Sequence, residues 1–358
     1  MDVQARLNLI KEVGEEIITE AELKELLESK KNPVAYDGFE PSGQMHIAQG
    51  ILRAININKM TKAGCKFKML AADWHAFANN KLGGDLEKIQ KAGDYIIEVW
   101  KVCGMDLGNV DFMRSSDIVH DPEYWKSVLN IAGLNTVQRI VRCAQIMGRS
   151  EREQLSASQI IYPCMQAADI FYLKADITQL GMDQRKVNVL AREIGPKLGF
   201  WKPVVVSHHM LMGFGEPKTD AKDAAERSIE LKMSKSKPDT AVFMTDSADD
   251  VKRKISKAYC PAKVVMENPV LEYCRYMIFE KLKSLEIKRP EKFGGDLNIE
   301  SYGELEKIYS SGKLHPADLK NSAAAAINEL LEPVRKHFST NAKARKLAEQ
   351  VRGFEITR

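Results

Sequence analysis

The chain has 358 residues, with 53 lysine and arginine residues against 49 acidic ones and a formal net charge of +4. A single hydrophobic core stops growing at about 250–300 residues, so the length predicts two domains. The small net charge is unevenly placed, because residues 243–358 carry 21 basic against 17 acidic residues and hold the whole excess. This composition permits a polyanionic partner for that region.

The spacing of the cysteines argues against a disulfide-bonded fold and against a zinc-binding fold. No CxxC pair occurs, and no histidine lies at a zinc-site spacing, so we expect no bound metal. We expect all six cysteines to be reduced and most of them to be buried: Cys65, Cys103, Cys143, Cys164, Cys260 and Cys274. No apolar run approaches the roughly 18 residues of a membrane span, and the amphipathic, acidic N-terminus lacks the features of a leader. The sequence therefore predicts a soluble, cytosolic protein without a membrane segment.

The first elements predict a phosphate-binding turn. Residues 3–30 follow helical spacing and predict one or two packing helices, and the apolar stretch from Pro33 to Phe39 predicts a buried strand. A helix is expected from near His46 to Gly64, followed by a second strand at residues 65–72. A strand, a tight glycine turn and a helix N-terminus direct free N–H groups and a positive dipole end to one point, which suits ATP.

The middle of the chain repeats the alternation of helix and strand. Helical spacing predicts a helix over residues 85–103, and short apolar runs predict strands at 110–113 and 203–207. This order favours an α/β fold with a doubly wound parallel sheet. The helical, basic stretch 117–158 is interpreted as an insertion between two halves of the sheet, whose exposed apolar residues, such as Ile140 and Met147, would contact a dimer partner.

The later part of the chain changes character. A long polar segment leads to KMSKS at residues 232–236, and a hydrophilic segment that ends in two lysines is typical of a mobile loop over phosphates. Beyond Phe243 the pattern becomes mostly helical. We therefore place the domain boundary there, with a catalytic α/β domain at residues 1–242 and a smaller helical domain at 243–358.

Several separated motifs occur in one order along the chain. HIAQ at residues 46–49, the set Tyr162, Gln166 and Asp169, and KMSKS at 232–236 are accompanied by GMDQRK at 181–186 and HPADLK at 315–320. Together they resemble the tyrosyl-tRNA synthetases of the archaeal and eukaryotic cytosolic type, in class I of the aminoacyl-tRNA synthetases, over nearly the whole chain. The resemblance implies a Rossmann-like catalytic domain, a helical anticodon-binding domain, a homodimer, and a ligase that uses ATP with Mg²⁺, L-tyrosine and tRNA-Tyr.

The resemblance also assigns an ATP site. Its residues are Gly38, Gly43, His46, Ala48, Gly181, Asp183, Lys232, Met233, Ser234, Lys235 and Ser236. His46, Lys232 and Lys235 would stabilise charge on the phosphates as catalytic residues. The family's usual His-Ile-Gly-His is His-Ile-Ala-Gln here, so Gln49 can donate a hydrogen bond but cannot be protonated. The alternatives are a solvent-facing His46, an Asp183 that only caps a helix and lysines that form a solvated surface.

A phenol pocket follows from the same resemblance. Tyr36 and Asp169 would lie on either side of the substrate hydroxyl. In tyrosyl-tRNA synthetase, the system for which this rule was established, such a pairing discriminates against phenylalanine by a factor of roughly 10⁵. The remaining residues expected to bind tyrosine are Leu70, Ala72, His75, Tyr162, Gln166 and Gln184. In the alternative interpretation Asp169 is a helix-surface carboxylate, Tyr36 is a core tyrosine and His75 is a satisfied polar residue at a strand end.

Contacts to tRNA are expected in both domains. Arg185 and Lys186 lie where the acceptor end would pass, while Phe293 and Asp318 resemble the pair that reads the anticodon by stacking and by accepting from guanine. Asp318 is also favourable in a helix's first turn for dipole reasons alone. The rival functions are tryptophanyl-tRNA synthetase and a synthetase-derived RNA-binding or signalling protein without catalysis.

Overall fold

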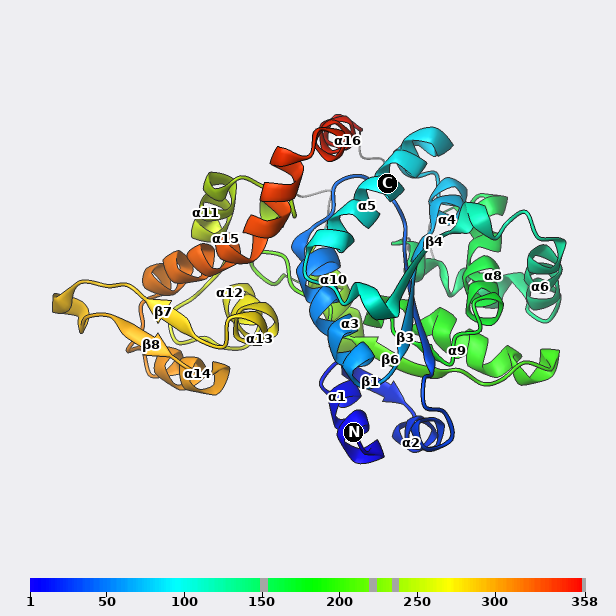
Figure 1. Ribbon diagram of the computed structural model, residues 1–358, viewed down its shortest axis with the longest axis horizontal. Coiled ribbons are helices and arrows are strands. Elements are labelled where there is room, and N and C mark those ends of the chain that lie inside the picture. The colour runs from blue at the N-terminus through cyan, green and yellow to red at the C-terminus, as the bar shows by residue number, and fades with distance from the viewer. Residues whose placement is uncertain (149–153, 219–223, 234–237, 356–358) are drawn as a thin grey trace.

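The computed structural model describes residues 1–148, 154–218, 224–233 and 238–355. Its centre is a six-stranded sheet with strand order β1-β6-β5-β2-β3-β4 (Figure 1). All neighbouring strands are parallel except β1 and β6. The strands are β1 (Gly14–Ile18), β2 (Val34–Phe39), β3 (Lys66–Ala71), β4 (Val110–Arg114), β5 (Ile177–Thr178) and β6 (Val204–His208).

Helices cover both faces of this sheet. Successive residues of a strand point to opposite faces, so Ala35 and Phe67 join one apolar cluster while Tyr36 and Leu70 join another. The first cluster includes α1 (Val3–Lys11), α2 (Glu20–Ser29), α3 (Arg53–Lys62) and α5 (Leu86–Val102). The second includes α6 (Pro122–Gly133), α7 (Val137–Val141), α8 (Ala157–Tyr172) and α9 (Arg185–Ile194), with α4 (Asp73–Ala78) packed on α8. The predicted doubly wound α/β fold is confirmed.

The helix ends follow local signals in the sequence. Asp85 caps α5 by accepting from the backbone N–H of Lys88. Gly64 and Gly104 follow α3 and α5 with φ of +93° and +85°, a backbone conformation that disfavours any other residue. Both predicted helix ends are therefore confirmed.

Two strands of the sheet, β1 and the two-residue β5, were not predicted. Residues 3–30 contain β1 between α1 and α2, so the expectation of helices alone is wrong there. β1 is a five-residue edge strand that pairs antiparallel with β6. A short, half-exposed strand carries little apolar periodicity of its own, and its pairing depends on a strand nearly two hundred residues later.

The predicted insertion is helical, but its exposed apolar residues are different ones. Ile140 and Met147 are buried, with exposed fractions of 4% and 3%, so their proposed availability to a partner is wrong. Both pack into the cluster that surrounds Tyr36 and Asp169's helix α8. The exposed apolar side chains of this region are Leu129, Leu134 and Val137, on α6, α7 and the turn between them.

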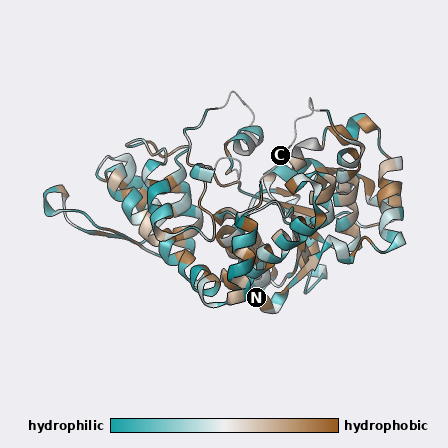
Figure 2. Ribbon diagram, turned by 90° about the horizontal axis from the view of Figure 1, so that it is seen from above, coloured by the Kyte–Doolittle hydropathy of each residue, from teal (hydrophilic) through white to brown (hydrophobic). Residues whose placement is uncertain are grey.

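The region beyond Phe243 is mostly helical, as expected, and carries an unpredicted two-stranded hairpin, β7 (Leu285–Ile287) and β8 (Leu297–Ile299). The hairpin extends from one end of the molecule (Figures 1 and 2). The helices of the region beyond Phe243 are α11 (Ala248–Lys257), α12 (Pro269–Tyr273), α13 (Phe279–Lys281), α14 (Tyr302–Ser310), α15 (Pro316–Thr340) and α16 (Ala342–Arg352). Helix α10 (Ala224–Leu231) precedes this region.

The two regions share one apolar core. The C-terminal helix α16 packs on α5, and a single cluster of buried residues extends from α1 to α16 (Figure 1). A backbone hydrogen bond also joins them, because Met244 N–H donates to Met45 O at 2.8 Å. The domain division at residue 243 stays a prediction.

No helix in the described ranges is long and apolar enough to cross a membrane. The six cysteines are all buried, as expected, and none forms a disulfide.

Candidate active site

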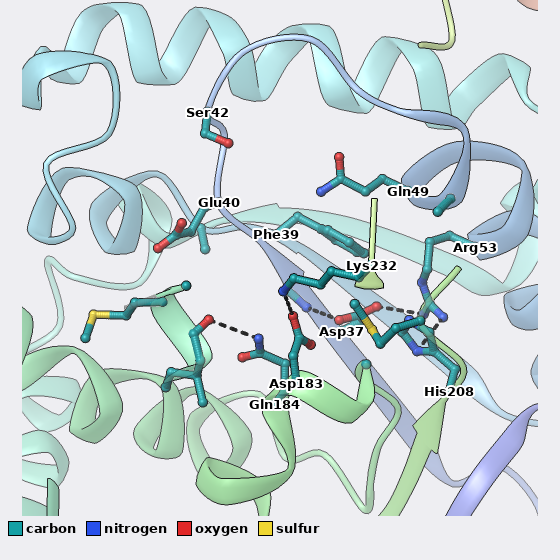
Figure 3. A pocket seen from close by; sticks show the side chains of 18 of the residues that line it. Asp37, Phe39, Glu40, Ser42, Gln49, Arg53, Asp183, Gln184, His208 and Lys232 are labelled. Carbon is teal, nitrogen blue, oxygen red and sulfur yellow. Dashed lines mark hydrogen bonds and ion pairs between the residues drawn. The ribbon is translucent and has the colours of Figure 1, made fainter. Parts of the chain in front are cut away.

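A pocket of about 570 Å³ opens where the strand order reverses, beyond the carboxyl ends of β2 and β5. Open α/β sheets bind ligands at this position, because adjoining loops leave the sheet in opposite directions. Most of the predicted site residues line it: Tyr36, Gly38, His46, Ala48, Gln49, Ala72, His75, Tyr162, Gln166, Asp169, Gly181, Asp183, Gln184, Lys232 and Met233. Figure 3 shows part of this lining.

Asp169 is the centre of a buried polar cluster at one end of the pocket. The carboxylate is 1% exposed, and it accepts from the Tyr124 hydroxyl at 3.0 Å and from the Tyr36 hydroxyl at 3.4 Å. His75 Nε2 lies 3.0 Å from the same carboxylate. The alternative of a helix-surface carboxylate is therefore wrong, and Asp169 is held by groups from three other elements, β2, α4 and α6.

The titration behaviour of this cluster follows from burial. Burial, and then the charge of Asp169, raise the pKa of Tyr36 well above its usual value, so its hydroxyl keeps its proton and donates. Burial opposes protonation of His75, but the neighbouring Asp169 outweighs it and raises the pKa of His75 above its ordinary value. Both Tyr36 and His75 thus keep a proton that they can donate to the Asp169 carboxylate.

The other predicted tyrosine-binding residues extend this end of the pocket. The Gln166 amide donates to Gln184 Oε1 at 3.0 Å, and Gln184 Nε2 donates to the Ile146 carbonyl at 3.0 Å. The Tyr162 ring packs edge-on against His75, with centroids 5.2 Å apart. Leu70 does not line the cavity and lies behind it in the apolar cluster with Tyr36 and Ala72.

Gly38 is required by the tyrosine beside it. A Cβ at this position would lie 2.8 Å from the Tyr36 hydroxyl, so a side chain there would displace the group that faces Asp169. Residues two apart on a strand share a face, which explains the approach. Gly38 therefore makes room for the tyrosine side chain in addition to lining the pocket.

The predicted phosphate turn leads into the helix as expected, with one irregularity. Gly43 has φ of +113°, which requires glycine, and His46 forms an isolated antiparallel bridge with Phe243. The helix then begins with a π turn, Ala48–Leu52. Such turns are frequent at functional sites. The Gln49 side chain lies in the pocket wall, with its Oε1 buried (Figure 3).

Lys232 spans the pocket to Asp183. Its ammonium lies 2.5 Å from the Asp183 carboxylate (Figure 3), and the strand-like backbone around Lys232 is fixed by a bridge to Met212. Two residues predicted to bind different parts of ATP are thus in contact. Ser234, Lys235 and Ser236 lie outside the described residues.

A second buried network lines the pocket near Asp183 and was not predicted. The Arg53 guanidinium contacts Asp37 at 2.7 Å and His208 Nδ1 at 3.2 Å (Figure 3). It also donates to Gln179 Oε1 at 2.6 Å. Burial raises the pKa of Asp37 to about 7, although Arg53 and the Gly38 N–H act in the opposite direction. Asp37 directly follows Tyr36, a residue predicted to bind tyrosine. That position in the strand was the sequence signal from which Asp37 could have been found.

A third group of charges lies where the pocket wall meets the C-terminal region. His209 Nδ1 lies 3.0 Å from Glu15, its Nε2 lies 3.3 Å from Glu272, and its ring stacks on Tyr276. Burial opposes its protonation, but hydrogen bonding to the two glutamates dominates and raises the pKa of His209 to about 9. His209 is therefore charged at neutral pH.

The predicted tRNA contacts lie outside this pocket. Arg185 pairs with Glu16 at 2.7 Å on the surface, and Lys186 follows it at the start of α9. Phe293 is 60% exposed in the hairpin loop, and Asp318 lies in the first turn of α15. Arg289 connects these last two segments, because its guanidinium donates to the Lys313 carbonyl at 2.8 Å, just before α15.

The arrangement joins a glycine turn that leads into a helix, a lysine that reaches across the pocket, and a closed polar end around Asp169, all at one switch point of a doubly wound sheet. This combination defines a class I aminoacyl-tRNA synthetase. A family model agrees: the chain belongs to the tRNA synthetases class I (W and Y), whose model matches residues 28–332.

Relatives resemble the chain over its whole length. It is 49% identical to tyrosine–tRNA ligase 1, cytoplasmic, of Arabidopsis thaliana, covering 100% of this chain and 90% of the relative. It is 40% identical to tyrosine–tRNA ligase of Saccharolobus solfataricus, covering 98% of this chain and 97% of the relative. The chain spans only 46% of a second plant relative, tyrosine–tRNA ligase 2, cytoplasmic.

Solved structures agree in fold. The tyrosyl-tRNA synthetase of Pyrococcus horikoshii complexed with L-tyrosine has a TM-score of 0.90 at 38% identity, covering 98% of this chain and 100% of that one. The tyrosyl-tRNA synthetase of Leishmania major in complex with tyrosinol also gives 0.90, at 44% identity, with 99% of this chain and 61% of that one covered. A tryptophanyl-tRNA synthetase from Aeropyrum pernix, at 18% identity and a TM-score of 0.65, shares the fold.

Proposed function

We propose that the chain is a cytoplasmic tyrosine–tRNA ligase whose pocket carries out both steps of aminoacylation. In the first step the tyrosine carboxylate attacks the α-phosphorus of ATP, which gives tyrosyl-adenylate and releases pyrophosphate. In the second step the terminal ribose hydroxyl of tRNA-Tyr takes the tyrosyl group and AMP leaves. Family membership supports the class of reaction, and the names of the relatives support the amino acid and the location.

The observation that carries the choice of tyrosine is the cluster around Asp169. A phenol both donates and accepts, and here it would meet the Asp169 carboxylate and the Tyr36 hydroxyl at the closed end of the pocket. Phenylalanine would leave these buried polar groups unpaired, which is costly. Gln166, Gln184 and Tyr162 line the same pocket, where they would hold the α-amino and carboxylate groups.

Catalysis at the nucleotide end is positioning and charge stabilisation. His46 and Gln49 would face the phosphates from the helix start, with Ala48 against the adenine. Lys232 would exchange Asp183 for phosphate oxygens when ATP binds, so that Asp183 accepts from the ribose hydroxyls beside Gly181. Lys235, outside the described residues, would act with Lys232.

Magnesium fits this site as a companion of ATP. In the part of the chain that the structure describes, no group of three or more histidine, cysteine or acidic residues is placed to hold a metal ion. Mg²⁺ usually keeps several waters and binds through substrate phosphates, so a dedicated protein cage is not required. It would neutralise charge on the leaving pyrophosphate, while Asp183 is the carboxylate nearest the phosphate-binding lysine.

Recognition of tRNA would use the two surface regions predicted from the sequence. Arg185 and Lys186 would contact the acceptor end, Phe293 would stack on an anticodon base, and Asp318 would accept from guanine at the first anticodon position. Asp318→Ala should then lower tRNA charging by about tenfold, using the 1–3 kcal/mol of a base contact in DNA as a scale, with pyrophosphate exchange unchanged. Charging of transcripts with guanine or cytosine there decides, because an acid that only favours the helix dipole leaves the preference intact.

A homodimer would bury the exposed apolar residues of the insertion. Leu129, Leu134 and Val137 lie on or beside α6 and α7, with exposed fractions of 64%, 47% and 63%. A symmetric pair of such surfaces is self-complementary. Sedimentation of the parent and of Val137→Asp tests it, and a parent that is monomeric and fully active at micromolar concentration would contradict the dimer.

The deciding experiment is amino-acid-dependent exchange of pyrophosphate into ATP without tRNA. Exchange with tyrosine, and none with phenylalanine or tryptophan, supports the proposal. Exchange with tryptophan would instead favour the related synthetase, and no exchange with any of them would favour an RNA-binding protein that has lost catalysis.

A further inference from the structure

The end of β6 places a histidine directly beside the glycine expected at the ribose. His208 and Gly181 form a parallel β-bridge, and the His208 N–H donates to Leu180 O at 2.9 Å. His208 Nε2 would lie 3.5 Å from a Cβ built on Gly181. The ring is 7% exposed and lines the pocket, so Nε2 faces the surface against which the ribose would lie.

The opposite ring nitrogen is fixed by two donors. Arg53 Nη1 lies 3.2 Å and Gln179 Nε2 lies 3.1 Å from His208 Nδ1 (Figure 3 shows the arginine contact). A guanidinium can only donate, so Nδ1 accepts and carries no proton. The Gln179 amide orientation is set independently, since its Oε1 accepts from Arg53 Nη2 at 2.6 Å.

The ring therefore has one form. Burial, and then the charge of Arg53, hold the pKa of His208 well below its usual value, so the ring is neutral. A neutral imidazole without a proton on Nδ1 carries it on Nε2. Within the described ranges Nε2 has no hydrogen-bond partner, so a donor is left facing the pocket beside Gly181.

We infer that His208 is a ribose-binding residue that donates a hydrogen bond, through Nε2–H, to a hydroxyl of the ATP ribose. The same hydroxyl would donate a hydrogen bond to the Asp183 carboxylate. A hydroxyl has one proton and two lone pairs, so a donor and a carboxylate on the two sides of Gly181 complement it. The three atoms nearest to a Cβ built on Gly181 are Met210 Sδ at 2.4 Å, Asp183 Oδ1 at 2.7 Å and His208 Nε2 at 3.5 Å, so the two polar groups converge there and the flexible Met210 side chain would move aside for the ribose. The inference rests on the proposed function, because it takes ATP as the occupant.

This donor sets a preference for ribonucleotides. A site built to hydrogen-bond a substrate hydroxyl rejects the analogue that lacks it, because its polar groups are then left unpaired. Asp37 and Gln179 act only through Arg53 and His208, as positioning residues that hold the donating tautomer.

The test compares two conservative variants. In His208→Gln the amide nitrogen can reach the position of Nε2, whereas in His208→Asn it reaches only the position of Nδ1. Tyrosine-dependent pyrophosphate exchange is measured with ATP, 2′-deoxy-ATP and 3′-deoxy-ATP. We expect His208→Asn to raise KM for ATP by about tenfold, the scale of one hydrogen bond, and to lose most of the parent's discrimination against one deoxynucleotide. His208→Gln should keep it.

The inference is overturned if His208→Asn discriminates against both deoxynucleotides as the parent does. Nitrogen-15 NMR of histidine-labelled parent protein gives a second reading that needs no variant, and a proton on His208 Nδ1 would also overturn it. A shift of the Nε2–H signal with ATP that is absent with one deoxynucleotide supports it. Failure of the proposed function looks different, because the parent itself would then show no exchange with tyrosine.

Discussion

The two ends of the pocket use polar groups in opposite ways. At the end that we propose for the amino acid, one buried carboxylate is surrounded by hydroxyls that keep their protons. At the end that we propose for the nucleotide, charges of both signs are paired, as in Arg53 with Asp37 and Lys232 with Asp183. The first set is held by packing around Asp169 and has no need to move. The second can exchange one ionic partner for another, as Lys232 would on meeting phosphate. The comparison suggests that one end selects the substrate and the other stabilises the transition state.

Removal of the carboxylate should have the largest effect. Asp169→Ala leaves Tyr36, Tyr124 and His75 without their shared partner, and truncating a buried charge of this kind costs about 2–5 kcal/mol or more. We expect kcat/KM for tyrosine to fall by about 10³ and the preference over phenylalanine to narrow. Unchanged binding of ATP serves as the folding control. A variant that discriminates like the parent would show that the phenol is read elsewhere.

A change at the other end should act on rate instead of affinity. His46→Ala removes a donor that is used as charge develops on the phosphates, so adenylate formation should fall by about 10². Rapid quench measures this rate, and equilibrium dialysis should show tyrosine affinity close to that of the parent. Equal losses in both quantities would break the division between a selecting end and a catalytic end.

Loss of one hydroxyl should sharpen the account of the selecting end. Tyr124→Phe removes the 3.0 Å hydrogen bond to Asp169 and keeps the ring packing. A hydrogen bond to a charged group is worth about 1.5–3 kcal/mol, so KM for tyrosine should rise about tenfold with kcat little changed. If only thermal stability falls, Tyr124 supports the fold and not the position of the carboxylate.

The smallest expected effect is a pH dependence of stability that comes from His209, which lies between Glu15 and Glu272. The pKa of His209 is raised to about 9 from 6.5, so the stability from its charged form is complete below pH 6.5 and is lost as the pH rises through 9. The melting temperature should fall over this interval, by about 2–5 °C, and His209→Gln should remove that part of the slope. The exposed His120→Gln is the matched control, and equal slopes in the parent and His209→Gln would contradict the assignment.

Much of the fold was predictable because its signals are local. Alternation of strand and helix, the glycines at helix ends and the capping of α5 by Asp85 all depend on neighbours within a few residues. β1 and β5 were missed because they pair with strands far along the chain. The hairpin β7–β8 was missed because strands of three residues are too short to show a period in the sequence.

The site divides in the same way. Residues within motifs, such as His46, Asp169 and Lys232, were expected and lie at the pocket. Tyr124, Arg53 and His208 were not expected, because each acts through a partner that is 45 to 155 residues away in sequence. Burial also reversed one expectation, since Ile140 and Met147 face inward although the helical pattern suggested a free surface.

The packing of α16 on α5 has a consequence for how the molecule comes apart. Because one apolar cluster runs from α1 to α16, melting either region exposes core of the other, and unfolding should be a single cooperative event. Calorimetric and van't Hoff enthalpies should therefore agree. A protease cut near residue 243 would then yield no stable N-terminal fragment, because the two regions form one folding unit.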